Sequence, residues 1–239
     1  MSELRLRALD GLPEIPPGDD LPTRLAALVP PGPGVLVVAQ KIVSKAEGRL
    51  VSLADIVPSP RALELAAQLG KEPRHTELVL RESVRVVRTA PGVLITETPH
   101  GLICANSGVD LSNAPGDEVA VLLPLDPDAS AERIRLALGP GRAVIISDTF
   151  GRPWREGLVD VAIGVAGLAP LRSYIGSTDR AGRELQVTVM ARADQIAAAA
   201  GMLMEKEAGT PAVWVEGVAI EGKGSSRELI RDPARDLFR

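Results

Sequence analysis

The residues with the most chemical potential are Ser147-Asp148-Thr149, with Arg152 and Arg155 close behind. They follow residues 144–146, a β-branched apolar run that is typical of a buried strand. Phe-Gly and Arg-Pro pairs come next and favour turns, so we expect the strand to end here and to present a carboxylate and a hydroxyl. Mg²⁺ prefers such oxygen ligands, and arginines bind phosphate oxygens. The stretch predicts a metal-assisted phosphate site; the alternative is an Asp turn beside solvated arginines.

A second polar group follows residues 35–39, another apolar run that is typical of a buried strand. Residues 40–49 contain a glutamine, two lysines, a serine and an arginine. Cationic and hydroxyl groups after a strand suit contacts with a nucleotide or with phosphate. The alternative is an amphipathic surface strand whose charges are solvated.

A third polar cluster lies in residues 98–113, which carry His100, Cys104, Asp110 and Asn113. If a helical turn begins at Asp110, its side chain and that of Asn113 point to one side. One of the two could then bind a metal and the other a base edge or a phosphate. The alternative for Asp110 is a turn or N-cap residue, and we expect His100 to be a surface histidine.

Other phosphate and metal motifs match this sequence poorly. Residues 217–224 nearly fit the P-loop pattern, but Gly224 stands where a Ser or Thr should hold Mg²⁺, and no helical pattern follows. The Asp-x-x-Gly pattern at Asp148 is too short to be specific, and no Gly-x-Gly-x-x-Gly follows a strand. One cysteine and two histidines exclude the usual zinc frameworks.

The composition limits the class of protein. The chain has 45% apolar but only 2% aromatic residues, so its core must be aliphatic. The net charge of −4 argues against a broad basic surface, and we expect no nucleic-acid partner. Cys104 cannot form an internal disulfide, which suits a reducing cytoplasm. The N-terminus does not resemble a signal peptide and no apolar run is long enough for a membrane span, so we expect a cytoplasmic protein without a membrane partner.

Both strands and helices must position these candidate site residues. Apolar periodicity, turn residues and caps such as Asp19 or Asp20 predict them. The predicted strands are residues 3–9, 35–39, 84–87, 93–96, 119–123, 144–146, 185–191, 213–215 and 218–220, and the predicted helices are residues 21–29, 60–70, 72–82, 129–138, 193–204 and 227–239. Residues 159–167 are small and apolar, which permits a close contact between backbones or between subunits; the alternative is packing inside one subunit.

Read in order, several motifs point to one family. They are Gly-Leu-Pro-Glu-Ile from residue 11, Gly-Asp-Asp-Leu from 18, Ser-Lys-Ala-Glu-Gly-Arg from 44, Cys-Ala-Asn-Ser-Gly-Val-Asp-Leu-Ser-Asn from 104, Leu-Leu-Pro-Leu-Asp-Pro-Asp from 122, Ser-Asp-Thr-Phe-Gly-Arg-Pro-Trp-Arg from 147, Gly-Arg-Glu-Leu-Gln-Val-Thr from 182 and Pro-Ala-Val from 211. This set closely resembles the coenzyme F420:L-glutamate ligase family, the F420-0:gamma-glutamyl ligases, over roughly residues 5–225. The family makes the γ-glutamyl part of a deazaflavin coenzyme.

The resemblance implies an α+β fold with two intimately associated lobes in a single ligase domain over residues 1–239. It also implies a homodimer with the cleft near the interface. Some relatives carry a fused C-terminal nitroreductase-like domain, and we expect this chain to be the stand-alone form without it. The boundary between the lobes cannot be placed from the sequence.

The resemblance also implies site residues. The nucleotide-binding positions are Leu12, Pro13, Glu14, Ile15, Gln40, Lys45, Asn113, Met204, Glu205, Lys206, Glu207, Ala208, Gly209, Thr210 and Pro211. Gln40 differs from the Ser of an archaeal member, and the loop from Met204 to Pro211 is one residue shorter than in archaeal examples. The implied metal ligands are Asp110, Asp148, Thr149 and Glu207, with Glu207 favoured over Glu205.

The implied reaction is a GTP-dependent ligation with Mg²⁺ or Mn²⁺. GTP phosphorylates the lactyl carboxylate of the deazaflavin precursor F420-0, and the amine of L-glutamate then displaces phosphate to form an amide. Further glutamates could join through γ-carboxylates. From the chemistry alone, we expect Arg152, Arg155 and Lys45 to offset phosphate charge beside Asp148. The alternatives are a nucleotide-dependent ligase for another carboxylate and a non-catalytic regulator that binds nucleotide and metal.

Overall fold

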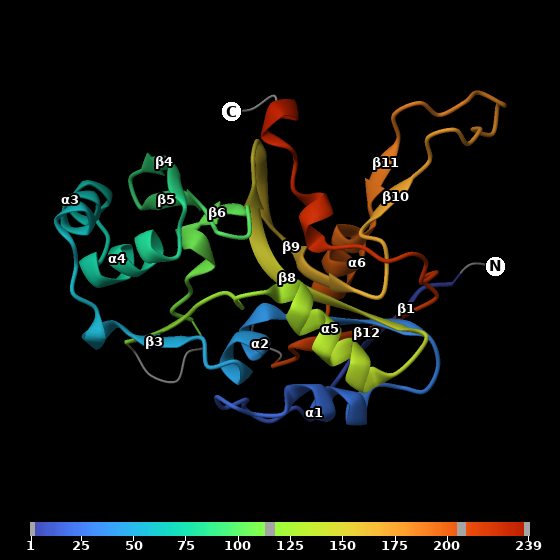
Figure 1. The fold of residues 1–239 in the computed structure, drawn as a ribbon, viewed down its shortest axis with the longest axis horizontal. Helices are drawn as coiled ribbons and strands as arrows, with labels where there is room; N and C mark the ends of the chain where they lie inside the picture. The colour runs from blue at the N-terminus through green and yellow to red at the C-terminus, as the bar shows by residue number, and fades with distance from the viewer. Residues whose placement is uncertain (1–2, 113–117, 205–208, 237–239) are drawn as a thin grey trace.

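A computed structural model describes residues 3–112, 118–204 and 209–236 of the chain (Figure 1). Its main lobe is built on a five-stranded sheet with the order β1-β12-β2-β8-β9. These strands are β1 (Arg5–Ala8), β12 (Ala212–Glu216), β2 (Gly34–Ala39), β8 (Arg142–Arg152) and β9 (Arg155–Ala166). The central pair β2 and β8 is parallel, and the other neighbours are antiparallel.

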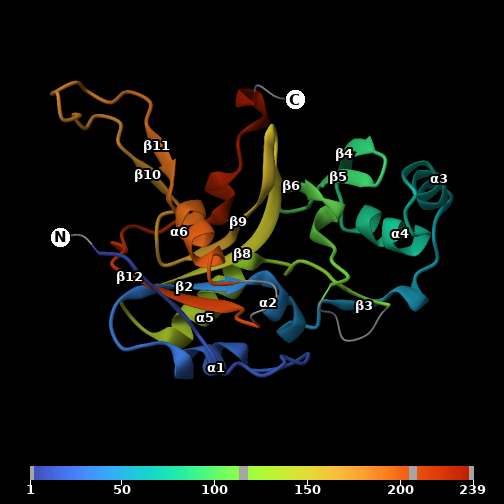
Figure 2. The same cartoon turned by 180° about the vertical axis from the view of Figure 1, so that it is seen from behind.

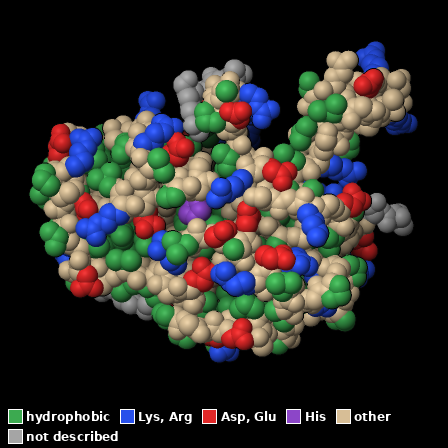
Figure 3. Space-filling view, viewed as in Figure 1, with side chains coloured by type: hydrophobic (Ala, Val, Ile, Leu, Met, Phe, Trp, Pro, Cys, Tyr) green, Lys and Arg blue, Asp and Glu red, His purple; other side chains and the backbone are tan. Residues whose placement is uncertain are grey.

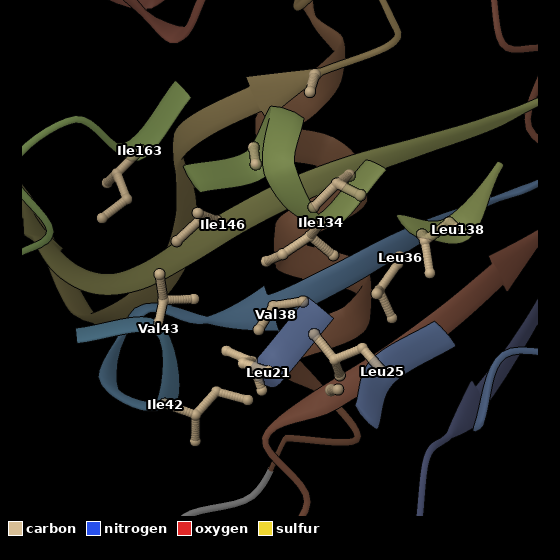
Figure 4. Close-up of a cluster of buried hydrophobic side chains, with 14 of the residues drawn as sticks. Leu21, Leu25, Leu36, Val38, Ile42, Val43, Ile134, Leu138, Ile146 and Ile163 are labelled. Atoms are coloured by element: carbon tan, nitrogen blue, oxygen red, sulfur yellow. The ribbon is translucent and has the colours of Figure 1, made fainter. Parts of the chain in front are cut away.

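Helices cover both faces of this sheet. The helices are α1 (Leu21–Leu28), α2 (Gln40–Ala46) and α5 (Pro127–Leu138) on one face and α6 (Arg192–Gly201) on the other. Side chains alternate along β2, so Leu36 and Val38 pack toward α1 and α5 (Figure 4), whereas Val35 and Val37 pack toward α6. Because both faces of β2 are buried, its apolar run is continuous.

A smaller lobe is inserted between α2 and α5 and lies to one side of the sheet (Figures 1 and 2). It contains β3 (Leu50–Ser52), η1 (Leu53–Asp55), α3 (Pro60–Leu69), α4 (Pro73–Arg81), β4 (Arg85–Ala90), β5 (Val93–Glu97), β6 (Ile103–Ala105), η2 (Asn106–Gly108) and β7 (Val119–Val121). Leu69, Leu78, Val79 and Leu94 belong to its own buried cluster. The predicted α+β fold with two associated lobes is therefore confirmed.

Two hairpins stand out from the main lobe (Figures 1 and 2). One is the upper part of β8 and β9, beyond the end of β2. The other is an arm with β10 (Leu171–Ser173) and β11 (Val189–Ala191) at its base. The arm exposes Ile175, Val187 and Met190. The C-terminal segment carries only the short turns η3 (Ser226–Leu229) and η4 (Pro233–Arg235).

The prediction that the strand ends near Ser147 is wrong. β8 continues to Arg152 because Asp148, Thr149 and Phe150 pair with residues of β9, and the turn falls only at Pro153 and Trp154. Asp148 and Thr149 therefore lie in the middle of a long strand. They do lie just beyond the end of β2, since Ala39 pairs with Ser147.

Several other local predictions also need correction. Residues 40–46 form helix α2 and not a surface strand, and residues 218–220 form no strand. Asp110 starts no helical turn, because its backbone exchanges two hydrogen bonds with Val121, at 3.0 and 2.8 Å. The C-terminal segment forms short 3₁₀ turns over its described part, where proline interrupts the predicted helix.

The small residues of β9 pack inside this chain. A Cβ on Gly164 would lie 2.4 Å from the carbonyl oxygen of Pro127, at the start of α5. Gly167 likewise lies against Arg135 and Arg142. The structure thus shows the packing role of this stretch, and the homodimer stays a prediction.

The charged surface is mixed. In Figure 3, Lys and Arg side chains alternate with Asp and Glu over the face that is shown. Among the described helices, none combines the length and the apolar character that a membrane crossing requires.

Candidate active-site cavity

A cavity of about 610 Å³ opens at the carboxyl end of β2, beside β8. Crevices at the carboxyl ends of parallel strands are common ligand sites in open α/β sheets. Its lining comes from segments far apart in the sequence: Leu12, Pro13, Glu14, Ile15, Ala39, Gln40, Lys41, Ile42, Lys45, Ser147, Asp148, Thr149, Asp160, Met204, Gly209, Thr210 and Pro211. The fold therefore brings most of the implied nucleotide positions to one place.

Some implied residues cannot be placed. Asn113 and the run Glu205, Lys206, Glu207 and Ala208 lie outside the described residues. The positions on either side of that run, Met204 and Gly209, do line the cavity. Asp110 lies beside the cavity through its contact with Lys41.

Helix α2 supplies the basic wall of the cavity. Lys45 is buried, and its Nζ lies 2.6 Å from Oε1 of Glu14, which is exposed. Gln40 is also buried, and its Oε1 accepts a hydrogen bond of 2.9 Å from Ser44. The first turn and the last turn of α2 thus place a polar group and a cation at one cavity.

Lys41 links the two lobes next to the cavity. Its Nζ lies 2.7 Å from Oδ2 of Asp110 and 2.7 Å from the hydroxyl of Ser112. The backbone N–H of Ser112 donates to Oδ1 of Asp110 at 2.7 Å. Burial alone would raise the pKa of Asp110, but Lys41 and Ser112 outweigh it, so the pKa is lowered and the group stays ionised.

Asp148 has the opposite environment. Burial raises its pKa to about 7, and the negative charges of Asp110 and Asp160 add to that rise. The backbone N–H of Thr149, which donates to Oδ1 at 2.9 Å, and the charge of Lys41 oppose it. The ionised carboxylate is therefore poorly stabilised by its surroundings, and a bound cation would stabilise it.

Thr149 turns away from Asp148. Consecutive residues of a strand face opposite sides, and the Thr149 hydroxyl donates to Oδ1 of Asp160 at 2.8 Å. Asp160 is held against the end of α6, where a Cβ on Gly201 would meet its Oδ2 at 1.9 Å. Asp160 could not be predicted as a cavity residue from the sequence, because only the register of the β8–β9 hairpin places it opposite Thr149.

The two carboxylates at the cavity are chemically suitable ligands for a divalent cation. Asp110 and Asp148 offer hard oxygen donors, and a bound cation would favour the ionised form of Asp148, whose pKa is raised mainly by burial. Within residues 3–112, 118–204 and 209–236, no three His, Cys, Asp or Glu side chains form a group that could hold a metal. The implied ligand Glu207 lies outside these ranges, so the metal set stays a prediction.

Arg152 and Arg155 do not line the cavity. Arg152 is four strand residues beyond Asp148, or about 13 Å along β8. Its Nη2 donates to the carbonyl oxygen of Glu156 at 2.9 Å. The structure therefore does not place the two arginines beside Asp148, because β8 continues to Arg152 where the sequence favoured a turn.

The near-match to a P-loop is also remote from this cavity. Gly222, Lys223 and Gly224 line a second cavity of about 520 Å³, together with Arg142 at the start of β8. The following residues form the 3₁₀ turn η3. As the sequence predicted, these residues do not form a P-loop followed by a helix.

Comparison with known proteins decides the family. The model of the F420-0:Gamma-glutamyl ligase family matches residues 11–217. The chain belongs to this family. Proteins named coenzyme F420:L-glutamate ligase are similar to it over nearly their whole length. The one from Methanopyrus kandleri is 46% identical, with 95% of this chain and 94% of that protein covered.

Two further relatives of that name agree. The protein from Methanothermobacter thermautotrophicus is 42% identical, with 99% of each chain covered. The protein from Archaeoglobus fulgidus is 43% identical, with 97% of this chain and 94% of that protein covered. The resemblance drawn from the motifs is thus confirmed.

Proposed function

We propose that this F420-0:gamma-glutamyl ligase family member joins L-glutamate to the lactyl carboxylate of F420-0 at the expense of GTP. Membership of the family supports the ligase activity. The observation that carries the nucleotide site is the convergence of residues 12–15, α2, β8 and residues 209–211 on one cavity. A cavity of about 610 Å³ also has a volume that is usual for small-molecule sites.

The reaction has two steps. A carboxylate oxygen of the acceptor attacks the γ-phosphorus of GTP, the bond to the β-phosphate oxygen breaks, and an acyl phosphate and GDP form. The amine of L-glutamate then attacks the acyl carbon, phosphate leaves with the bonding electrons, and the nitrogen loses a proton. Repetition at a γ-carboxylate would extend the tail.

This chain contributes position and charge. Phosphoryl transfer depends on alignment and charge neutralisation more than on covalent help. Lys45 and Lys41 would neutralise phosphate oxygens from α2, and Asp110 and Asp148 would hold Mg²⁺ or Mn²⁺ with Glu207. Thr149 would join them only if its hydroxyl left Asp160. When bound, such an ion would neutralise charge on the phosphates.

Guanine selectivity is part of the proposal. Residues 12–15 and Asn113 would meet the base, and guanine offers donors where adenine does not. A site built for those hydrogen bonds rejects the analogue strongly, because its own polar groups are left unpaired. GTP should therefore have a much higher kcat/KM than ATP.

One experiment separates the candidate functions. GDP release is measured with and without L-glutamate, and with and without F420-0. Release that requires both, with a glutamylated product, supports the proposal. Release that requires glutamate and another carboxylate indicates a different ligase, and binding of GTP without turnover indicates a regulator. Equal kcat/KM for ATP and GTP would contradict the nucleotide choice.

We also propose that the enzyme is a cytoplasmic homodimer built from a single domain. The family resemblance and the exposed apolar residues of the arm, such as Val187 and Met190, support a subunit contact. Stable homodimers bury roughly 2,000 Å² or more and are usually two-fold symmetric. Sedimentation should give twice the 25.1 kDa chain mass, and a fully active species of single-chain mass on dilution would refute the dimer.

A further inference from the structure

The tip of the β8–β9 hairpin displays an aromatic ring in an unusual way. Trp154 is 78% exposed, although the chain has only two tryptophans and the other, Trp214, is fully buried. Its φ is 57°, in the left-handed region, at the third position of a four-residue turn that begins at Arg152. Glycine or asparagine is favoured at such a position. A bulky residue kept under this strain is a signal of function.

A second observation at the tip points to a ligand. The Nε of Arg152 is buried and has no hydrogen-bond partner in the described part of the chain. Arginine is only a donor, so the missing partner is an acceptor atom. The guanidinium is held in place through Nη2, which donates to the carbonyl oxygen of Glu156. Arg155 is paired with Arg152 across the hairpin, so the tip combines a ring with two cations.

The hairpin joins this tip directly to the cavity. Asp148, Phe150 and Arg152 alternate along β8 and so share one face. Trp154 lies in the turn just beyond Arg152, which is four residues after Asp148, or about 13 Å along β8. The acceptor of the proposed function is a long molecule with its reacting carboxylate at one end and a planar deazaflavin ring at the other. A carboxylate placed near Asp148 would direct the ring toward this tip.

The geometry points to a subsite for the acceptor ring at Arg152, Trp154 and Arg155, which rests on the proposed function. The indole stacks on the planar heteroaromatic ring, and the guanidinium groups bind its oxygen or nitrogen acceptors. Stacking and donated hydrogen bonds of this kind suit a flat ligand with acceptor atoms at its edge. The two arginines thus serve the acceptor and not the nucleotide.

Trp154→Gly is the informative variant. Glycine adopts this φ without strain, so the turn is kept or stabilised while the ring is lost. We expect KM for F420-0 to rise about tenfold, with KM for GTP within about twofold of the wild type. Trp154→Phe should retain most of the affinity, and Arg152→Lys should raise KM for F420-0 because it lacks Nε. Val57→Ala, at an equally exposed apolar residue of the smaller lobe, is the control.

A binding measurement tests the same subsite without turnover. F420-0 titrated in the absence of GTP should quench tryptophan emission in the wild type and much less in Trp154→Phe, in which only the buried Trp214 remains. An unchanged KM for F420-0 in Trp154→Gly overturns the subsite while the proposed function stands. Conversion of Trp154→Gly from a dimer to single chains also overturns it, because the tip is then a subunit contact. A wild type that neither binds nor glutamylates F420-0 refutes the proposed function itself.

Discussion

The ammonium group of Lys41 lies 2.7 Å from Oδ2 of Asp110, so a lysine of the main lobe neutralises a carboxylate of the smaller lobe. This contact has two effects. It lowers the pKa of Asp110 and fixes the side chain beside the cavity. It also occupies an oxygen that the proposed divalent cation would use, so Lys41 and that cation would compete for Asp110.

Lys41→Gln should therefore tighten metal binding to the nucleotide-free protein. Removal of the competing cation from a partly exposed pair should lower the Kd for Mn²⁺ about three- to fivefold. The measurement is a Mn²⁺ titration that follows free Mn²⁺ by electron paramagnetic resonance. Arg61→Gln, which breaks the exposed Arg61–Glu64 pair of α3, is the control and should leave the Kd unchanged. Weaker Mn²⁺ binding in Lys41→Gln would show that the pair does not compete with the metal.

Asp148→Asn should remove most ligase activity. The amide keeps the shape but loses the negative charge that would attract the cation, so kcat/KM at fixed Mg²⁺ should fall about a hundredfold or more. The fold should persist, because burial of a neutral amide is less costly than burial of a charge. Steady-state kinetics and thermal unfolding, measured together, check both parts. Near-normal turnover would exclude Asp148 as a metal ligand.

Glu77→Gln should destabilise the protein at neutral pH only. Glu77 accepts hydrogen bonds from the N–H of Ser59 at 3.0 Å and from Arg81 at 2.9 Å, which lower its pKa to about 2. A lowered folded-state pKa contributes stability that is present above the unfolded pKa of 4.5 and lost as the pH falls toward 2. We expect a loss of about 2 kcal/mol at pH 7 that shrinks steadily below pH 4.5.

Urea denaturation of the wild type and Glu77→Gln at pH 7 and at low pH measures this difference. Glu64→Gln is a suitable control, because Glu64 and Arg61 form an exposed pair on α3 that should contribute less than about 1 kcal/mol. A loss for Glu77→Gln that is equal at both pH values would mean that its charge does not stabilise the fold.

Gly164→Ala should destabilise the main lobe, because the added Cβ meets the Pro127 carbonyl oxygen at 2.4 Å. Overpacking against backbone should lower the free energy of unfolding by about 2–3 kcal/mol. Gly151→Ala in the same hairpin is the matched control, since its Cβ would lie 3.7 Å from Leu158 and meets nothing closer. Equal stability of the two variants in thermal unfolding would show that β9 and α5 separate easily.

Much of the fold could be predicted from the sequence where local signals agree. Helix α1 begins after Asp20, whose side chain accepts from the N–H of Thr23, as its capping residue predicted. α3 ends at Gly70, which has a left-handed conformation. The buried strand β2 followed from its apolar run. In each case neighbouring residues determine the structure.

The candidate site was less predictable, because it depends on pairing between distant residues. The polar, glycine-containing residues after Ser147 suggested a turn, yet β9 keeps them in a strand. Asp160 lies opposite Thr149 only because the hairpin register shifts between Ile146 and Ser147. Likewise, Lys45 could be predicted as a residue of the candidate site, but its burial in α2 depends on packing against the main lobe.

The antiparallel pairing of β3 with β7 determines how the smaller lobe can move. The chain leaves the main lobe through β3 and returns through β7, so both crossings lie side by side. A rotation of the smaller lobe that keeps both strands paired would pivot on them and would break the contact between β6 and β8. Asp110 is fastened to these strands by its two backbone hydrogen bonds with Val121. A rotation of the smaller lobe about these two strands would therefore widen or narrow the approach to Asp148 while Asp110 stays in place.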